Sequence, residues 1–335
     1  MCDSAQIHTP LPHVFPHLCT IRQGQGGCLP VCVGLSYTLD GQVRVFRVVR
    51  EGDKHAVVEY NVRALLEGDI ATSYTQADNS VVVATDSIKN TCYVIAKTSP
   101  HVLSPELYGL HLGTHFVTKY PHIHKAFITI EQLKWTRIDV EGTPHKHSFV
   151  RDGEEKIVVN VEVDATAGKD KVSANVTAGI KDLLVLKSSG SAFEGFIRDE
   201  YTTLVEVDDR IFSTSIDLDY SIKLPNEPIT IDGLGSLGEK AKFRELQSNV
   251  RKITLETFAT DESASVQATM YKMSQQFIAE NATANSISYR LPNNALSRMS
   301  RLDYIGLANT KPKDAEVFCP VEAPSGYITA TVSRT

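Results

Sequence analysis

Histidines at two-residue spacing are the side chains whose arrangement most directly suggests chemistry. They form two pairs, His122 with His124 and His145 with His147. Residues two apart on a β-strand point to the same face, so each pair could present two imidazole ligands to a metal ion. Taken alone, the spacing leaves open whether these histidines bind a metal or are ordinary strand residues.

A second group of possible metal ligands lies near the N-terminus. The spacing Cys28-x-x-x-Cys32 matches no standard zinc pattern, and the surrounding Pro- and Gly-rich segment lacks apolar periodicity. We therefore favour disorder for residues 1–36. Cys92 and Cys319 lie far apart in apolar stretches, and we expect both to be reduced core residues. The other cysteines and histidines of the N-terminal segment are Cys2, Cys19, His8, His13 and His17.

Composition and charge narrow the class of protein. The 335 residues are enough for two domains, and 42% hydrophobic with 22% charged residues is typical of a soluble globular protein. The formal net charge of -6 gives no electrostatic reason to expect nucleic acid or an anionic membrane as partner. No apolar run approaches the roughly 20 residues of a membrane span, and no secretory signal is visible, so we expect an intracellular protein.

Strands and paired helices are expected in the first half of the chain. Period-two alternation predicts strands over 43–49, 56–66, 124–140 and 143–150. A helix is expected from Thr85 to about Lys97, capped by side-chain oxygens of Thr85, Asp86 and Ser87. Another helix should start with Pro105 at its first position and end before Pro121.

The second half of the chain repeats this order. Strands are expected over 156–163, which closes the first unit, and then over 182–187, 200–206, 211–216 and 286–291. Helices are expected over 239–250 and 262–279. The repetition indicates an internal duplication and an α+β fold, with antiparallel sheets and helices layered on one face. Exposed sheet edges would favour assembly with partner subunits.

A series of motifs in one order resembles urate oxidase (uricase), and it is closest to the fungal members of that family. The resemblance covers about residues 43–332. The motifs that carry it are Ser73–Thr75, Ala77–Ser80, Val83–Thr91, Gly113–Phe116, Trp135–Arg137, His145–Phe149, Phe196–Thr203, Ser263–Tyr271 and Ala315–Phe318. The resemblance implies two tandem tunnelling-fold domains, here expected over 37–172 and 173–335. The segment 1–36 would then be an N-terminal extension, either disordered or the product of a misjoined exon.

The resemblance also implies an activity and its partners. Urate, O2 and water would give 5-hydroxyisourate and H2O2, a step of purine degradation. The enzyme would use no metal or organic cofactor. The resemblance assigns no ligand role to the paired histidines. A homotetramer with active sites at subunit interfaces is implied, with urate and O2 as small-molecule partners and neither nucleic acid nor membrane.

Matching the family residue by residue implies a substrate-binding set in the second half. Phe193 would stack under the purine, and Arg210 would clamp the anion with two charge-assisted hydrogen bonds. Gln267 would recognise the opposite purine edge through its amide, with Val266 and Ile328 supplying a backbone contact and an apolar wall. Plainer interpretations remain open, because Phe193 could be a core aromatic and Gln267 a solvated polar residue. Arg210 could pair with Asp208 or Asp209 on the surface.

The proton and oxygen side of the implied site has three further residues. Thr85, the implied catalytic residue, would pass a proton through its hydroxyl and also bind substrate. Asp86 would bind substrate through its backbone N–H, both residues coming from a neighbouring subunit. Asn293 would face the oxygen site above the ring. Helix capping is the plainer interpretation of Thr85 and Asp86, and both roles can hold together.

Two expected relay residues are missing. The family Lys that activates the threonine falls on Leu39 or Asp40, and the family His falls on Ala295. Losing a general acid–base group typically lowers rate about 100- to 10,000-fold. A single-base frame fault near residue 294 could explain the second loss, since it would restore Asn-Lys-His-Tyr. The alternative function is an impaired uricase-like paralogue that binds urate or serves as a structural subunit.

Localisation is expected mainly from the family. A peroxide-forming enzyme benefits from a peroxisome, where catalase is close. The C-terminal residues Ser333, Arg334 and Thr335 are a poor match to a Ser-Lys-Leu signal, because threonine does not fit the last position. Without that signal the protein would be cytoplasmic.

Overall fold

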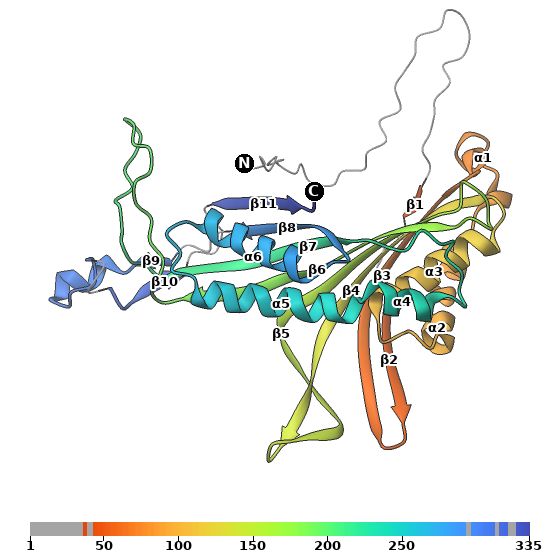
Figure 1. The fold of residues 1–335 in the computed structure, drawn as a ribbon, viewed down its shortest axis with the longest axis horizontal. Helices are drawn as coiled ribbons and strands as arrows, with labels where there is room; N and C mark the ends of the chain where they lie inside the picture. Colours follow the sequence, from red (N-terminus) through yellow and green to blue (C-terminus); the bar gives the residue numbers. More distant parts are fainter. Residues whose placement is uncertain (1–35, 39–42, 293–295, 312–314, 321–325) are drawn as a thin grey trace, which may run out of the picture. The chain divides into compact units, whose positions relative to one another are not determined.

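The computed structural model describes residues 36–38, 43–292, 296–311, 315–320 and 326–335 (Figure 1). They divide into two compact units. The N-terminal unit comprises described residues up to 178 together with 221–244, and the C-terminal unit comprises 179–220 and 245–335. The predictions for residues 1–35, Leu39, Asp40, Asn293 and Ala295 lie outside the described residues.

Long antiparallel strands form the N-terminal unit. The strand order is β1-β3-β4-β5, and β2 also pairs with β3. The strands are β1 (Ser36–Thr38), β2 (Val43–Glu51), β3 (Lys54–Gly68), β4 (Ile123–Val140) and β5 (Thr143–Asp164). This confirms the predicted strands over 43–49, 56–66 and 124–140, because apolar side chains alternate along them with one face buried.

The helical segments of this unit are α1 (Ala71–Thr75), the 3-10 turn η1 (Asn79–Val81), α2 (Thr85–Thr98), α3 (Pro105–Lys119) and α4 (Leu234–Ala241). Of these, α2 packs on β2, α3 packs on β4 and β5, and α4 packs on α3. The predicted start of α3 is confirmed, since Pro105 is its first residue and the Ser104 hydroxyl oxygen accepts a 3.4 Å hydrogen bond from Leu107 N.

Close packing of α3 on β4 and β5 depends on two glycines of the helix. A Cβ atom on Gly109 would lie 2.9 Å from Val161 Cγ2, and one on Gly113 would lie 2.4 Å from Val163 Cγ2. The helix can therefore approach the sheet only because side chains are absent at these positions. Beside it, the buried rings of Tyr60 and Tyr108 stack 5.5 Å apart, and both phenols donate to backbone carbonyls.

The C-terminal unit has a similar composition of strands and helices. Its strands follow the order β7-β8-β11, and β6 (Ser173–Lys187) begins in the N-terminal unit and ends here. Helix α6 packs on β8 and β11. The remaining elements are β7 (Phe212–Ile222), α5 (Phe243–Thr260), α6 (Val266–Glu280), β8 (Ala284–Pro292), β9 (Leu296–Arg298), η2 (Ser300–Ile305), β10 (Phe318–Pro320) and β11 (Tyr327–Ser333).

Several predicted boundaries are wrong, each for a local reason. The strands expected over 143–150 and 156–163 are one strand, β5, whose middle residues 151–154 are exposed and so carry no apolar alternation. The helix expected over 239–250 is two helices, because Lys242 takes a left-handed conformation with φ of 58°. The helix expected from 262 starts at Val266.

The strand expected over 200–206 is absent from the described structure. Its apolar residues are exposed instead, with Tyr201 at 82% and Val205 at 71%. The alternating apolar residues of this segment therefore do not pack into the core of the chain. The predicted α+β class, with antiparallel strands and layered helices, is confirmed.

Glu106 is a carboxylate buried in the first turn of α3. It is 2% exposed, its Oε2 accepts a 2.7 Å hydrogen bond from the Ser104 hydroxyl, and its Oε1 is buried without a partner among the described residues. Burial raises the pKa of this carboxyl above its ordinary value of 4.5. The folded chain therefore keeps this proton to a higher pH than the unfolded chain does.

Replacing Glu106 by Gln should remove a pH-dependent loss of stability. In the parent, the unfolded chain releases this proton at lower pH than the folded chain, so the free energy of unfolding falls as pH rises above 4.5. Glutamine cannot ionise, so Glu106→Gln should lose less stability than the parent as pH rises above 4.5. Urea unfolding measures this, with exposed Glu154→Gln as control. Equal pH slopes for parent and variant would contradict the prediction.

Candidate active site

Short backbone pairings in the C-terminal unit bring the segments that carry Phe193 and Arg210 together. Phe193 and Val207 exchange backbone hydrogen bonds of 2.8 and 3.1 Å, and Arg210 N donates to Ser191 O at 2.8 Å. The intervening loop, 194–206, is largely exposed. Phe193 and Arg210 are thus neighbours although the sequence separates them by a long loop.

The ring of Phe193 and the guanidinium of Arg210 are in contact. Arg210 Cζ lies 5.3 Å from the ring centroid, within the range of a cation–π interaction. The Phe196 ring stacks on Phe193 with centroids 4.8 Å apart and planes within 14°. Phe193 is half-buried rather than enclosed, so the plainer interpretation as a core aromatic does not describe it.

Arg210 is a half-buried cation with unused hydrogen-bonding capacity. Its Nε is buried without a hydrogen-bond partner among the described residues. Burial lowers the pKa of the guanidinium, although arginine keeps its charge at neutral pH. A planar donor held partly out of water, with one donor unpaired, is prepared for an anionic acceptor.

The surface ion-pair interpretation of Arg210 is wrong. The Asp209 carboxylate accepts hydrogen bonds from the Ser189 hydroxyl at 2.6 Å and from Gly190 N at 2.7 Å, which hold the pKa of Asp209 below its ordinary value. Within the described ranges, no ion pair joins Arg210 to Asp208 or Asp209. Asp209 instead anchors the turn that precedes Phe193.

The start of α6 is joined to the same ladder. Ser263 N donates to Gly190 O at 3.0 Å, and Ala192 N donates to Ser263 O at 2.9 Å. Ser265 caps the helix, its hydroxyl oxygen accepting from Ala268 N at 3.4 Å. The next two residues are Val266, which is buried, and Gln267, which is exposed and accepts a 3.0 Å hydrogen bond from the Ser265 hydroxyl through Oε1.

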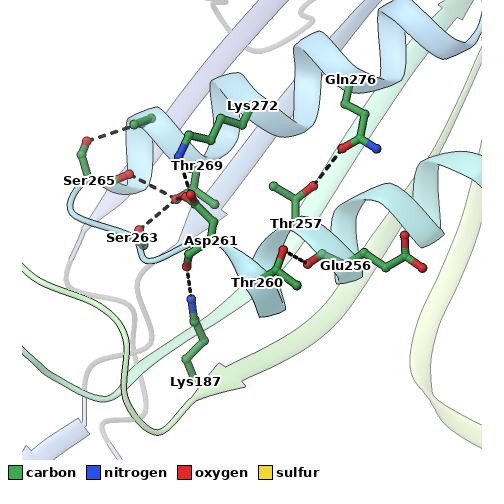
Figure 2. A network of polar contacts seen from close by, with 11 residues as sticks. Lys187, Glu256, Thr257, Thr260, Asp261, Ser263, Ser265, Thr269, Lys272 and Gln276 are labelled. Carbon is green, nitrogen blue, oxygen red and sulfur yellow. Dashed lines mark hydrogen bonds and ion pairs between the residues drawn. The ribbon is translucent and has the colours of Figure 1, made fainter.

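A buried polar network lies beneath the start of α6, and sequence reasoning did not assign it a role (Figure 2). At its centre is Asp261, whose carboxylate accepts from the Thr269 hydroxyl at 2.6 Å and pairs with Lys272. Lys187 Nζ donates to the Asp261 carbonyl. Ser263 and Thr269 belong to the motif 263–271, so the motif was visible even though the network was not.

Thr85 and Asp86 lie in the N-terminal unit at the start of α2, and both are exposed. The predicted start of the helix is confirmed, but side-chain capping is wrong, because the N-cap residue is Ala84 and makes no side-chain hydrogen bond. Ala84 O accepts from Ile88 N, so the amides of residues 85–87 have no partner within the helix. The Asp86 carboxylate accepts instead from Asn90 Nδ2 at 2.9 Å.

Of the other implied residues, Ile328 is described and Asn293 is outside the described residues. Ile328 is half-buried in β11, opposite Leu291 of β8. Its place as an apolar wall stays a prediction.

The histidine pairs have partners of their own. His122 Nε2 lies 3.0 Å from Val81 O, and His124 Nε2 lies 2.9 Å from Asp69 Oδ2. The rings of His145 and His147 contact each other with centroids 4.7 Å apart. Across the described ranges, no three His, Cys, Asp or Glu side chains are grouped as metal ligands.

The two described cysteines differ in exposure. Cys92 is a free, buried thiol, as predicted, and burial raises its pKa to about 12. Cys319 is exposed in β10, so its predicted place in the core is wrong. The apolar sequence around Cys319 lies in a short two-stranded sheet with β9 instead of in the main core. No helix in the described part of the chain has the length and apolar character needed to cross a bilayer.

Comparisons with known proteins bear on the family of the chain. The sequence model of the family described as Uricase matches residues 40–162 and 176–329. The uricase of Emericella nidulans is 49% identical over 295 residues, covering 87% of this chain and 94% of the relative. The uricase of Aspergillus flavus is 48% identical, covering 87% of this chain and 93% of the relative.

A solved structure supports the same relationship. The crystal structure of uricase from Arthrobacter globiformis matches with a TM-score of 0.75 and 31% identity, covering 90% of this chain and 93% of that chain. The resemblance to fungal uricases and the expected tunnelling fold are thereby confirmed. With matches this extensive in sequence and in fold, the chain belongs to the uricase family.

Proposed function

We propose that this chain is a urate oxidase, which converts urate, O2 and water into 5-hydroxyisourate and H2O2. The observation that carries the proposal is the contact between Phe193 and Arg210, whose Nε is buried and has no partner in the part of the chain that the structure describes. A flat anion is the ligand class that suits both groups, because a phenyl ring can stack on a planar ligand and a guanidinium can donate paired hydrogen bonds.

Urate binding would use both rims of the purine. Phe193 stacks under the ring, while Arg210 donates two parallel hydrogen bonds to adjacent acceptors on one edge. Gln267 reads the opposite edge with its amide, which both donates and accepts. Val266 contributes a backbone contact, and Ile328 an apolar wall. The backbone ladder from Ser263 to residues 190–192 supports this arrangement, since it ties the start of α6 to the Phe193 segment.

Proton transfer and oxygen binding would involve Thr85, Asp86 and Asn293. Thr85 is exposed, so its hydroxyl is accessible for passing a proton. The Asp86 amide precedes the first internal hydrogen bond of α2 and can donate to substrate. Asn293 would face O2 above the ring. Two electrons pass from urate to O2, which leaves as H2O2, and water supplies the hydroxyl oxygen, so the proposal requires neither a metal nor an organic cofactor.

The proposal includes the arrangement of the chain. We place one tunnelling-fold domain over 37–172 and another over 173–335, with four copies forming a tetramer and Thr85 and Asp86 completing a neighbour's site. Peroxisomal localisation follows from the peroxide product alone. Arg334 offers little support as part of a free targeting tail, because its guanidinium donates to Ala284 O at 3.1 Å and to Asn281 O at 2.9 Å.

Substitutions of the anion-binding pair should weaken urate binding. Arg210→Lys keeps the charge but loses the paired donors, and Phe193→Ala loses the stacking face, so each should weaken binding about 10- to 100-fold. Calorimetry without O2 measures the affinity, and peroxide release measures turnover. Arg63→Lys, on an exposed position of β3, is the matched control. Unchanged urate affinity in both site variants would reject the proposed site.

Restoring the missing relay should raise turnover without changing affinity. The variant Ala295→His combined with Leu39→Lys, or with Asp40→Lys, would return the two proton-transfer groups that other uricases carry. We expect the turnover number to rise at least about 100-fold, because a positioned acid–base group contributes that much. Stopped-flow peroxide assays measure it. An equal rise in affinity and turnover would show that the substitutions act on binding instead.

Assembly should be measurable directly. Large apolar side chains are exposed in the described chain, with Ile197 94%, Tyr304 88% and Ile305 72% accessible. Exposure on this scale favours burial against other subunits. Light scattering after size exclusion should therefore give about four times the 36.9 kDa chain mass. A monomer at micromolar concentration would argue against sites completed by a neighbour.

A further inference from the structure

Asp261 lies at the junction between two parts of the proposed urate site. It follows the last residue of α5, and its backbone N–H donates to Thr257 O at 3.0 Å. Its side chain is only 10% exposed. Figure 2 shows the carboxylate facing the first turns of α6, where Thr269 and Lys272 point toward it. A carboxylate so placed contacts α6 without being part of it.

One chain of hydrogen bonds leads from Asp261 to the Phe193 segment. The Thr269 hydroxyl lies 2.6 Å from Asp261 Oδ2 and 2.9 Å from Ser263 Oγ. A hydroxyl has one proton, so Thr269 donates to the carboxylate and can accept from Ser263. Ser263 is buried, and its backbone pairs with Gly190 and Ala192. This series of hydrogen bonds therefore ends at Ala192, one residue before Phe193, whose ring is proposed to stack on urate.

Two lysines keep Asp261 charged and fixed. Lys272 pairs with its carboxylate, and Lys187 from β6 donates to its carbonyl (Figure 2). Burial by itself would raise the pKa of Asp261, but the hydrogen bonds from Lys272 and Thr269 bring it below its ordinary value. The carboxylate is thus an ionised acceptor at neutral pH, and charge-assisted hydrogen bonds of this kind are the strong ones.

We propose that Asp261 is a positioning residue that fixes Gln267 relative to Phe193 and Arg210. It acts through Thr269 and Ser263, which hold the first turn of α6 against the ladder that carries the ring and the guanidinium. The inference rests on the proposed function of this site. Asp261 does not touch urate; it determines how well the amide of Gln267 meets the purine edge.

Asp261→Asn tests this with little change of shape. The amide keeps the volume but loses the charge that pairs with Lys272, and it leaves one acceptor oxygen in place of the two that serve Thr269 and Lys272. Urate affinity, measured by calorimetry without O2, should weaken about tenfold. The neighbouring Glu262→Gln removes the same charge from an exposed side chain and should leave affinity unchanged. Parent-like affinity in Asp261→Asn would overturn the proposal.

A double-mutant cycle separates positioning from a general loss of structure. If Asp261 acts through Gln267, then Asp261→Asn should cost little further affinity in a Gln267→Ala background. The two losses would multiply if Asp261 only supported the fold. Multiplying losses would therefore also overturn the proposal.

A second set of variants covers the case in which Asp261→Asn does not fold. Thr269→Val removes the central hydroxyl and should weaken urate binding about tenfold, while Thr269→Ser keeps the hydroxyl and should bind as the parent does. Thr257→Val is the structural control. The Thr257 hydroxyl donates a 3.3 Å hydrogen bond to Gln276 Oε1, which joins α5 to α6 away from Ser263 (Figure 2). Equal losses in Thr269→Val and Thr257→Val would reject positioning.

The same measurements distinguish this inference from the proposed function. If the parent binds urate and Gln267→Ala weakens it, while the Asp261 and Thr269 variants bind normally, only the positioning role fails. If the parent does not bind urate at all, the proposed function fails and the positioning role fails with it.

Discussion

Backbone pairing between three separated segments is the constraint on which the site depends. Residues 190–193 pair with Val207 and Arg210 on one side and with Ser263 on the other, all through hydrogen bonds of 2.8 to 3.1 Å. Side chains alone could not hold a ring and a guanidinium in contact on an exposed surface, since long side chains lose entropy when ordered. The ladder fixes both Cα positions first, so that only the side-chain torsions remain to be ordered.

The charged groups around this ladder differ in whether their hydrogen-bonding atoms already have partners. Asp209 and Asp261 have their carboxylates satisfied by hydrogen bonds from hydroxyls, an amide or a lysine, and so they serve as anchors. Arg210 Nε is buried and lacks a partner among the residues described, and so it can donate to a ligand. A buried unpaired donor is costly in a folded protein, which is a physical reason to connect it with a ligand. An anion site requires a cation with a donor left unpaired, and it tolerates nearby carboxylates only when these already have partners.

The residues of the candidate site could be found from sequence only by resemblance to a family. From the sequence alone, Arg210 next to two aspartates suggests a surface ion pair. In the structure, the Asp209 carboxylate instead accepts hydrogen bonds from the Ser189 hydroxyl and from Gly190 N. Thr85 and Asp86 read as helix caps, yet Ala84 occupies the cap. For Asp209, the sequence indicates a partner next to it along the chain, whereas its hydrogen bonds come from residues that are near only in space. The sequence does not distinguish Asp261, because a single aspartate before a helix can have many plainer roles.

For the fold, the sequence by itself determined those strands and helices whose periodic apolar residues pack into a core. Strands β2, β3 and β4 and helices α2 and α3 follow directly from apolar periodicity, Pro105 and polar residues at helix starts. Only the tertiary structure decided the continuous strand β5, the break at Lys242 and the irregular loop 194–206. The physical reason is that periodicity reports burial. Where a strand leaves the core or a loop exposes apolar residues, hydrogen bonds between distant segments decide the conformation.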